Sequence, residues 1–202
     1  MTRTPEQNAA MRDATRELIQ SAAVRVFAQR GFAASNIRHI AEEAGLSTGS
    51  IYRHYASKEA LFDELLGQAS TGLTAASAMF MSEADPLTLV RDFTRVFLAD
   101  LAGGNGEVEF FLVMNQGFLT DTPSGTAERL AATQRPLWDA FADLVRRGQA
   151  TGQFEDGDPA QITAYYFAML AGVAGMRTVI PDAITETGVD VVLRLLTRRG
   201  AP

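Results

Sequence analysis

A short polar stretch near the N-terminus carries the side chains with the clearest chemical use. Its members are Thr48, Gly49, Ser50, Tyr52, Arg53 and His54. Hydroxyl, guanidinium and imidazole groups hydrogen-bond to phosphate oxygens and to the edges of bases, and a glycine lets the backbone approach a ligand closely. The set therefore predicts a surface that faces DNA.

Two short helices joined by a tight turn are expected to position this surface. The first helix is predicted over residues 36–44, where the apolar positions at helical spacing are Ile37, Ile40, Ala41 and Ala44. Ser35 or Asn36 can cap its first amides. Gly45 follows the last apolar position, where a left-handed residue ends a helix and reverses the chain.

The second helix is predicted to run from a cap at Ser47 through Tyr55. Ile51 and Tyr55 lie four residues apart, so both can face the first helix and leave the polar set outward. Ser57 can cap a following, longer helix. A short helix, a glycine-bearing turn and a second helix suited to the major groove make up a helix-turn-helix.

The stretch from Ser35 to Phe62 resembles the N-terminal signature of the tetracycline-repressor (TetR) family of transcriptional regulators. The residues that carry the resemblance are Ile40-Ala41, Ala44-Gly45-Leu46-Ser47, Gly49, Ile51-Tyr52, His54-Tyr55, Ser57-Lys58-Glu59 and Leu61-Phe62. The match runs without a gap, covers the first third of the chain and extends weakly back through residues 16–32. The chain departs from the family at Asn36 and Ile37, where many members have a hydroxyl residue.

The resemblance implies specific DNA contacts. Tyr52, His54 and Lys58 look like the positions that contact phosphates. The positions that look groove-facing are Arg38, Thr48, Gly49 and Ser50. Ser35 is expected to supply the phosphate contact that Asn36 and Ile37 lack. The whole predicted DNA-binding set is Ser35, Arg38, Ser47, Thr48, Gly49, Ser50, Tyr52, Arg53, His54 and Lys58.

The charge is unevenly distributed along the chain. Residues 1–58 contain eight basic and five acidic side chains, a net charge of +3, whereas the remainder contains ten basic and nineteen acidic ones, a net charge of −9. A mildly basic head on an acidic body directs phosphates to one end of the molecule. This asymmetry agrees with the predicted DNA-facing surface.

The composition excludes several kinds of site. The 202 residues include no cysteine, and both histidines lie in the first part of the chain. There is no disulfide framework, thiolate metal site or nucleotide-binding loop, so we expect no cofactor, no metal and no enzyme. No apolar run approaches the roughly 18 residues of a membrane helix, and the N-terminus lacks the apolar core of a signal peptide. We expect a cytoplasmic protein without membrane contact.

Helical periodicity continues to the C-terminus, and no segment alternates like a strand. A mobile arm over residues 1–11 should precede the first helix, and Arg3, Arg12 and Arg16 are candidate contacts to phosphates or the minor groove. The predicted helices cover residues 13–30, 36–44, 47–55, 57–82, 86–101, 107–118, 126–151, 160–180 and 189–196. The helix over 126–151 is either continuous or divided at Pro136. The fold class is all-α, with a three-helix helix-turn-helix head (1–62) and an α-helical body (63–202).

The body is rich in aromatic and methionine side chains. Such residues often simply fill a core, but together they can also line an apolar cavity, and the resemblance implies an effector pocket. The candidate effector-binding residues are Phe93, Phe97, Phe111, Met114, Phe118, Trp138, Phe141, Tyr165, Tyr166, Met169 and Arg177. Their low charge favours a small, largely apolar effector.

Two long helices, over 126–151 and 160–180, present more apolar surface than one chain is expected to cover. The resemblance likewise implies a homodimer, formed through the last long helices, that binds an inverted-repeat operator in double-stranded DNA. It further implies a repressor that the effector releases. One alternative is an architectural DNA-binding dimer without an effector. Another is an all-α enzyme, which the inventory of side chains opposes.

Overall fold

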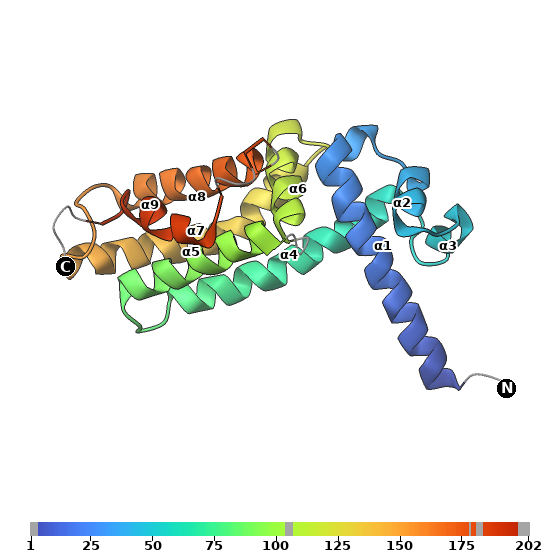
Figure 1. Ribbon diagram of the computed structural model, residues 1–202, viewed down its shortest axis with the longest axis horizontal. Helices are drawn as coiled ribbons and strands as arrows, with labels where there is room; N and C mark the ends of the chain where they lie inside the picture. Colours follow the sequence, from blue (N-terminus) through green and yellow to red (C-terminus); the bar gives the residue numbers. More distant parts are fainter. Residues whose placement is uncertain (1–3, 104–106, 178, 181–183, 198–202) are drawn as a thin grey trace.

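The computed structural model describes residues 4–103, 107–177, 179–180 and 184–197, and this part of the chain is helical, without strands (Figure 1). The elements are α1 (Pro5–Ala34), α2 (Ile37–Ala44), α3 (Thr48–Tyr52), α4 (Lys58–Phe80), α5 (Pro86–Gly103), α6 (Glu107–Thr120), α7 (Thr126–Ala150), α8 (Pro159–Met176), η2 (Glu186–Gly188) and α9 (Val189–Leu193). The all-α class is confirmed. Helices α1 to α3 form a head at one end, and α4 runs from it into a body made by the later helices.

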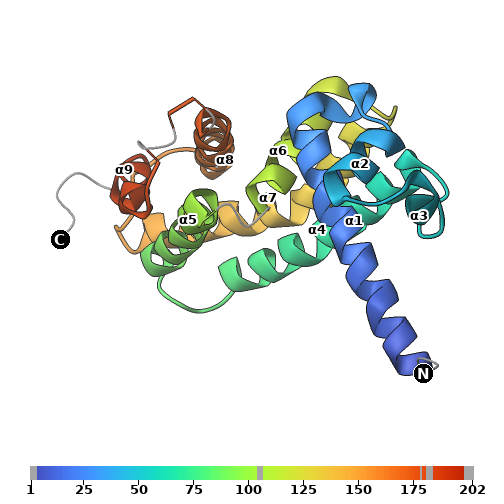
Figure 2. The same ribbon diagram turned by 45° about the vertical axis from the view of Figure 1, so that its right-hand side comes forward.

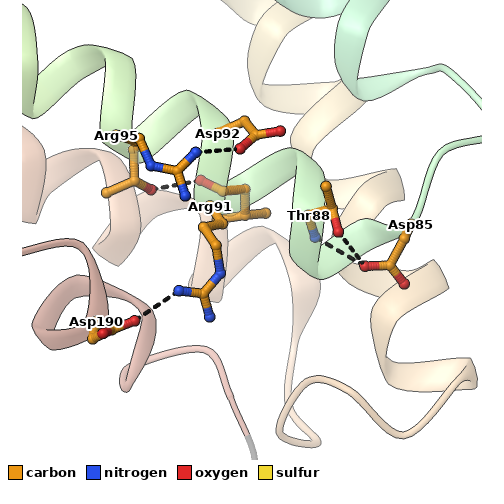
Figure 3. Close-up of polar contacts among 8 residues, drawn as sticks. Asp85, Thr88, Arg91, Asp92, Arg95 and Asp190 are labelled. Atoms are coloured by element: carbon orange, nitrogen blue, oxygen red, sulfur yellow. Dashed lines mark hydrogen bonds and ion pairs between the residues drawn. The ribbon is translucent and has the colours of Figure 1, made fainter.

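Two body helices begin at Asp-Pro pairs, close to the predicted starts at residues 86 and 160. The Asp85 carboxylate accepts a hydrogen bond from the Thr88 N–H at 2.9 Å (Figure 3). Asp158 likewise accepts from the Ala160 N–H at 3.0 Å. In each pair the carboxylate satisfies a helix-end amide, and the proline has no N–H to leave unpaired. Helix α7 remains one helix through Pro136.

Helix α1 starts earlier than predicted, so the expected mobile arm over residues 1–11 is wrong from residue 4 onward. Thr4 and Gln7 form a reciprocal capping box, and Pro5 occupies the first helical position. Residues 4–14 are all exposed, and this half of α1 projects from the head (Figures 1 and 2). Because its side chains stay exposed, its sequence carries no apolar stripe that would reveal it. Gly31, with φ of 74°, interrupts the helix near its predicted end.

The core of the head contains three aromatic rings. Phe32 lies 4.7 Å from Phe62 and 5.4 Å from Phe27, measured between ring centroids. The same apolar cluster also includes residues from beyond the predicted boundary at residue 62, namely Leu65, Leu66, Val113, Met114 and Leu130. The head therefore packs directly on α6 and α7 of the body.

The core of the body is a chain of stacked and edge-on aromatic rings. Phe141 lies 4.5 Å from Tyr166 in a stacked arrangement and 5.1 Å from Phe80 edge-on. Tyr166 is buried, and its hydroxyl shares a 2.8 Å hydrogen bond with Thr94. Burial raises the pKa of Tyr166 well above its usual value. The phenol is therefore neutral, and dispersion and apolar burial hold this region together.

Polar contacts connect neighbouring helices of the body near their ends. Arg91 of α5 donates to Asp190 of α9 at 2.7 Å, as Figure 3 shows. The guanidinium of Arg147 donates to the carbonyl oxygens of Phe80 and Ser82, both at 2.6 Å, which satisfies the last turn of α4. These contacts join α9 to α5 and α7 to α4.

Candidate nucleic-acid interface

Local capping fixes the angle between α2 and α3. The Asn36 side chain accepts from the His39 N–H at 3.0 Å, so Asn36 rather than Ser35 caps α2. Gly45, at φ of 66°, ends α2 as predicted. Ser47 then accepts from the Ser50 N–H at 3.1 Å and caps α3. The helix-turn-helix geometry therefore follows from three short-range signals in the sequence.

The recognition helix is shorter than predicted, since α3 ends at Tyr52 rather than Tyr55. Ile51 and Tyr55 are nevertheless both buried, at 0% and 4% exposure, and face the core as predicted. A turn formed by Arg53 and His54 brings Tyr55 back to the core. The turn thus keeps the spacing of the two core residues without further helix.

The outer face of α3 presents the predicted polar side chains. Thr48 and Gly49 are exposed, and Tyr52 is 57% exposed. Arg53 donates to the Ser50 hydroxyl at 2.9 Å, which orients the guanidinium along α3. On α2, Arg38 is exposed and pairs with Glu42 at 3.4 Å. Helix α3 lies at the end of the molecule away from the body (Figure 1).

A groove of about 550 Å³ lies where α2, α3 and α4 meet. Its lining residues are Ser35, Asn36, Ile37, Arg38, Thr48, Tyr52, Ala56, Ser57, Lys58 and Glu59. The capping residues of α2 and α4, Asn36 and Ser57, both belong to this lining. A helix N-terminus carries positive partial charge and unpaired amides, which favour phosphate. The groove can therefore receive the backbone of one DNA strand.

Lys58 takes part in the head structure as well as in the groove. Its Nζ donates to the carbonyl oxygens of Phe32 at 2.7 Å and Ser35 at 2.8 Å. The same nitrogen lies 4.1 Å from the centroid of the Phe32 ring. An ammonium has three donors, so one is left for a phosphate. The ammonium thus satisfies two carbonyl oxygens at the end of α1 from the groove side.

Ser35 corrects the predicted set. Its side chain is buried, with 4% of the residue exposed, and its hydroxyl donates to the Gly31 carbonyl at 2.6 Å. The predicted phosphate contact through this hydroxyl is therefore wrong. Sequence position alone suggested it, whereas the break at Gly31 turns Ser35 inward to satisfy a free carbonyl.

His54 is half-buried beside several cationic groups. Burial lowers the pKa of His54 below its ordinary value of 6.5, and the positive charges of Arg12, Arg16 and Arg53 lower it further. The imidazole is therefore neutral near pH 7 and can hydrogen-bond to a phosphate without contributing charge. The cations around it supply that charge, and Arg12 does so from α1. Arg3 lies outside the described residues.

Arg16 belongs to an internal network rather than to the DNA face. It forms an ion pair with Glu64 through two hydrogen bonds, one of them from Nε at 2.7 Å. Gln20 donates to Glu64 at 2.5 Å and to the Tyr55 hydroxyl at 3.0 Å. The Arg16 hydrogen bonds are the main cause of the lowered pKa of Glu64. The network ties α1, α4 and the segment after α3 together, so the expectation that Arg16 contacts phosphate is wrong for this conformation.

The predicted effector-binding residues do not line one common space. Phe141 and Tyr166 are fully buried in the body core, whereas Met114 packs in the core of the head. Tyr165 is 67% exposed and belongs to neither of these two cores. The residues that are half-buried are Phe93, Phe97, Phe111, Trp138, Met169 and Arg177. The side chain of Phe118 lies outside the described residues.

Two further features are absent from the described part of the chain. No three His, Cys, Asp or Glu side chains there come close enough to hold a metal ion. None of the helices in that part combines the length and apolarity needed to cross a bilayer.

Comparison with protein families places the head among known regulators. Residues 13–65 match the model described as bacterial regulatory proteins, tetR family. The chain is 32% identical over 155 residues to the HTH-type transcriptional repressor KstR2 of Mycolicibacterium smegmatis, which covers 75% of this chain and 71% of that protein. It is 28% identical over 195 residues to the regulator TtgR of Pseudomonas putida, with 88% and 91% covered.

Solved structures share the whole architecture. The MbdR regulator from Azoarcus sp. CIB superposes with a TM-score of 0.76 at 22% identity, covering 90% of this chain and 97% of that one. The ketosteroid transcriptional regulator KstR2 of Mycobacterium tuberculosis gives a TM-score of 0.70 at 21% identity, covering 91% and 95%. The arrangement of head and body is therefore shared with solved regulators.

Proposed function

The chain belongs to the TetR family of bacterial regulatory proteins and is therefore a DNA-binding transcriptional regulator, and we propose that it is a homodimeric repressor released from its operator by a small, largely apolar effector. The observation that carries the proposal is the groove between α2, α3 and α4, into which two helix N-termini open beside the exposed face of α3. Anionic backbone and base edges can be contacted there together.

The proposed DNA contacts are the predicted set without Ser35. They are Arg38, Ser47, Thr48, Gly49, Ser50, Tyr52, Arg53, His54 and Lys58. Tyr52, His54 and Lys58 hold phosphates, and the exposed hydroxyl of Thr48 reads base edges in the major groove. Phosphate contacts set the register of α3, and the groove-facing side chains give sequence preference.

The proposed dimer interface is the outer face of α8. Tyr165, Ala168, Gly172 and Met176 are exposed at intervals of three and four residues, so they form one stripe. A Cβ added at Gly172 would meet nothing within 4 Å, which leaves room for a second helix. An exposed apolar stripe of this length favours a partner, and a second copy gives the two recognition helices that an inverted repeat requires.

We propose a functional division into residues 1–62, which bind DNA, and 63–202, which bind the effector and dimerise. The two parts are mechanically joined, because α4 belongs to both and because Val113 and Met114 of α6 are buried in the head core. An effector that prefers one arrangement of α6 would thus shift the head and change the spacing of the two recognition helices.

The proposed effector site uses the half-buried aromatic residues of the body. Phe97 and Phe111 lie 5.2 Å apart between α5 and α6, and Phe93 lies 6.3 Å from Phe167 of α8. These rings are held by apolar contacts that can rearrange around a ligand. Among solved relatives, one regulator is described as a complex with triclosan and another as a ketosteroid regulator. Both descriptions support a largely apolar effector here.

The first test is selection from a pool of random duplex DNA. We expect the full chain to enrich an inverted repeat, and we expect Ala168→Arg, which places charge in the proposed interface, to lose that enrichment. Sedimentation of both proteins separates loss of the dimer from loss of folding. If the wild-type chain enriches no inverted repeat at low salt, the proposed dimeric repressor is wrong.

The second test concerns the effector. Fluorescence anisotropy of the selected operator is measured while neutral aromatic and steroid-like compounds are titrated. Release of DNA by a compound that is recovered unchanged supports a regulator. An operator-binding protein that no compound releases would fit the architectural alternative, and conversion of the compound would indicate an enzyme.

A further inference from the structure

A second concave site lies at the joint between head and body. It has a volume of about 420 Å³ and is formed by the last turns of α1, by Phe62 of α4, and by α6 with the loop after it. None of the described lining residues belongs to the predicted effector-binding set. It is therefore distinct from the proposed effector site between α5, α6 and α8.

The described lining residues combine apolar walls with one charged side chain. Phe32, Phe62 and Val113 form the walls, and Thr120 adds a polar edge. The charged residue among them is Arg30, which is exposed. Within the described part of the chain, its guanidinium has no hydrogen-bond or ion-pair partner. An unpaired guanidinium beside an apolar space suits an anion with an apolar body.

The two acids next to lining residues in the sequence are already engaged. Asp63, which follows Phe62, pairs with Arg129 at 2.7 Å. Asp121 precedes the lining residue Thr122, but its carboxylate accepts a 2.9 Å hydrogen bond from the Ala127 N–H at the start of α7. Hydrogen bonds from the backbone of Ala127, Gly125 and Thr126 lower the pKa of Asp121. This carboxylate is thus used to begin α7, and among the described residues Arg30 has no acidic partner.

We propose that this cavity at the joint between head and body binds a small carboxylic acid with an aromatic or short aliphatic body. We propose further that this binding lowers the affinity of the head for DNA. The carboxylate pairs with Arg30, and the apolar body lies against Phe32, Phe62 and Val113. The effect on DNA rests on the proposed repressor function, whereas the binding itself does not.

The cavity and the DNA groove lie on opposite ends of one short segment, residues 32–36, which contributes to the lining of both. Phe32 lines the cavity, and its ring and carbonyl both contact Nζ of Lys58, which lines the groove. Three residues further on, Ser35 accepts from the same Nζ, and Asn36 caps α2. A ligand that moves Phe32 therefore moves the acceptors that hold Lys58 and the cap of α2. The coupling requires no change in the body.

The test uses the full chain labelled with ¹³C at alanine and valine methyl groups. Ala33, Ala34 and Val113 line the cavity and act as built-in reporters. The probe is 4-phenylbutyrate, and the neutral 4-phenyl-1-butanol is its control. We expect the butyrate to shift the methyl signals of these three residues and the alcohol to bind about fivefold more weakly, since it lacks the charge-assisted bond.

Two variants and one matched control localise the binding. Arg30→Gln should weaken the butyrate about fivefold, and Ala33→Trp should abolish its binding by filling the space. Arg135→Gln removes an exposed arginine on α7 and should bind like wild type. Unmoved methyl signals in wild type, or equal affinity of wild type and Arg30→Gln, would overturn the proposed site. Arg30→Gln changes an exposed residue, so this comparison holds even if Ala33→Trp fails to fold.

Operator binding is then measured with and without saturating 4-phenylbutyrate. We expect the affinity for DNA to fall about fivefold in wild type and to stay unchanged in Arg30→Gln. If the methyl signals move but operator affinity does not, the proposed coupling is wrong and the site stands. If the protein binds no operator at all, the repressor proposal fails while the methyl titration still decides the site.

Discussion

The head and the body both have aromatic cores, but the head adds a polar network of side chains to its core, whereas aromatic packing dominates inside the body. In the head, Arg16, Gln20, Tyr55 and Glu64 form a directional polar network, and Lys58 fixes two carbonyls. In the body, the rings around Phe141 pack on one another at centroid distances of 4.5 to 5.2 Å. Hydrogen bonds have strict geometry, whereas apolar packing does not.

This difference suits the two tasks. A surface that reads DNA must hold its side chains at fixed positions, because a misplaced donor cannot reach a base edge. A body that answers to a small apolar molecule must allow its side chains to repack around it. The two regions meet at α6, where Phe111 contacts Phe97 of the body and Met114 packs in the head.

Removing the central ring of the body should have the largest effect on stability. Phe141 is fully buried and contacts Phe80, Tyr166 and Phe167. We expect Phe141→Ala to lower the free energy of unfolding by about 3 to 5 kcal/mol, measured by urea denaturation. Phe141→Leu, which keeps most of the volume, should cost much less. Equal costs for the two variants would contradict tight packing of the rings.

Breaking the polar network of the head should cost less but depend on pH. Glu64→Gln keeps the shape of the side chain while removing the charge that Arg16 and Gln20 contact. We expect it to lower the free energy of unfolding by about 2 kcal/mol at pH 7. Phe141→Ala is the comparison, because its cost should not vary with pH in the same range.

The direction of the pH dependence follows from the lowered pKa of Glu64 in the folded state. A carboxylate with a lowered folded pKa stabilises the protein fully above its unfolded pKa, near 4.5, and loses that contribution as pH falls through the folded value. The gap between wild type and Glu64→Gln should therefore narrow below about pH 4.5. A gap that stays constant down to pH 3 would contradict the network as described.

Lys58 connects the polar architecture to DNA binding. Lys58→Ala removes two hydrogen bonds to half-buried backbone, so we expect a loss of about 1 kcal/mol in unfolding free energy. It should also weaken DNA binding and reduce the slope of log affinity against log salt by about one. Arg135→Gln serves as the control for nonspecific charge. An unchanged salt slope would assign Lys58 to the structure of the head alone.

Much of the fold could be predicted because its signals are local. Asp85, Asp158, Asn36 and Ser47 each begin a helix through a bond to an amide two or three residues away. Such bonds depend only on neighbouring residues, so the sequence displays them. The starts of these four helices and the helix-turn-helix were thus predicted closely, whereas the start of α1, which Thr4 also caps locally, was placed at residue 13 instead of Pro5.

The errors concern which partner a side chain meets. Tyr165 and Tyr166 are adjacent, yet one is exposed and the other buried beside Phe141. Met114 and Phe111 both lie on α6, but α6 is packed between two cores, so they enter different ones. Periodicity identifies the apolar face of a helix, but it does not identify the element that packs against that face. Ser35 was misplaced for a different reason, since its hydroxyl turns inward to the carbonyl that the break at Gly31 leaves free.

The smallest expected effect on stability comes from Tyr52→Phe, which should change operator affinity and leave the free energy of unfolding nearly unchanged. Tyr52 is 57% exposed on the outer face of α3, and its ring is not part of either core. Tyr52→Phe removes only the hydroxyl proposed to hold a phosphate. We expect operator affinity to fall about fivefold, near 1 kcal/mol, while the free energy of unfolding changes by less than about 0.5 kcal/mol.

The informative result is the pattern across DNA sequences. A lost phosphate contact weakens binding to operator and to unrelated duplexes alike, because phosphates are present in both. Thr48→Ala, on the same helix, should instead change the preferred operator sequence more than the overall affinity. If Tyr52→Phe alters sequence preference and Thr48→Ala does not, the roles proposed for the two side chains are reversed, although the fixed geometry of the head would still stand.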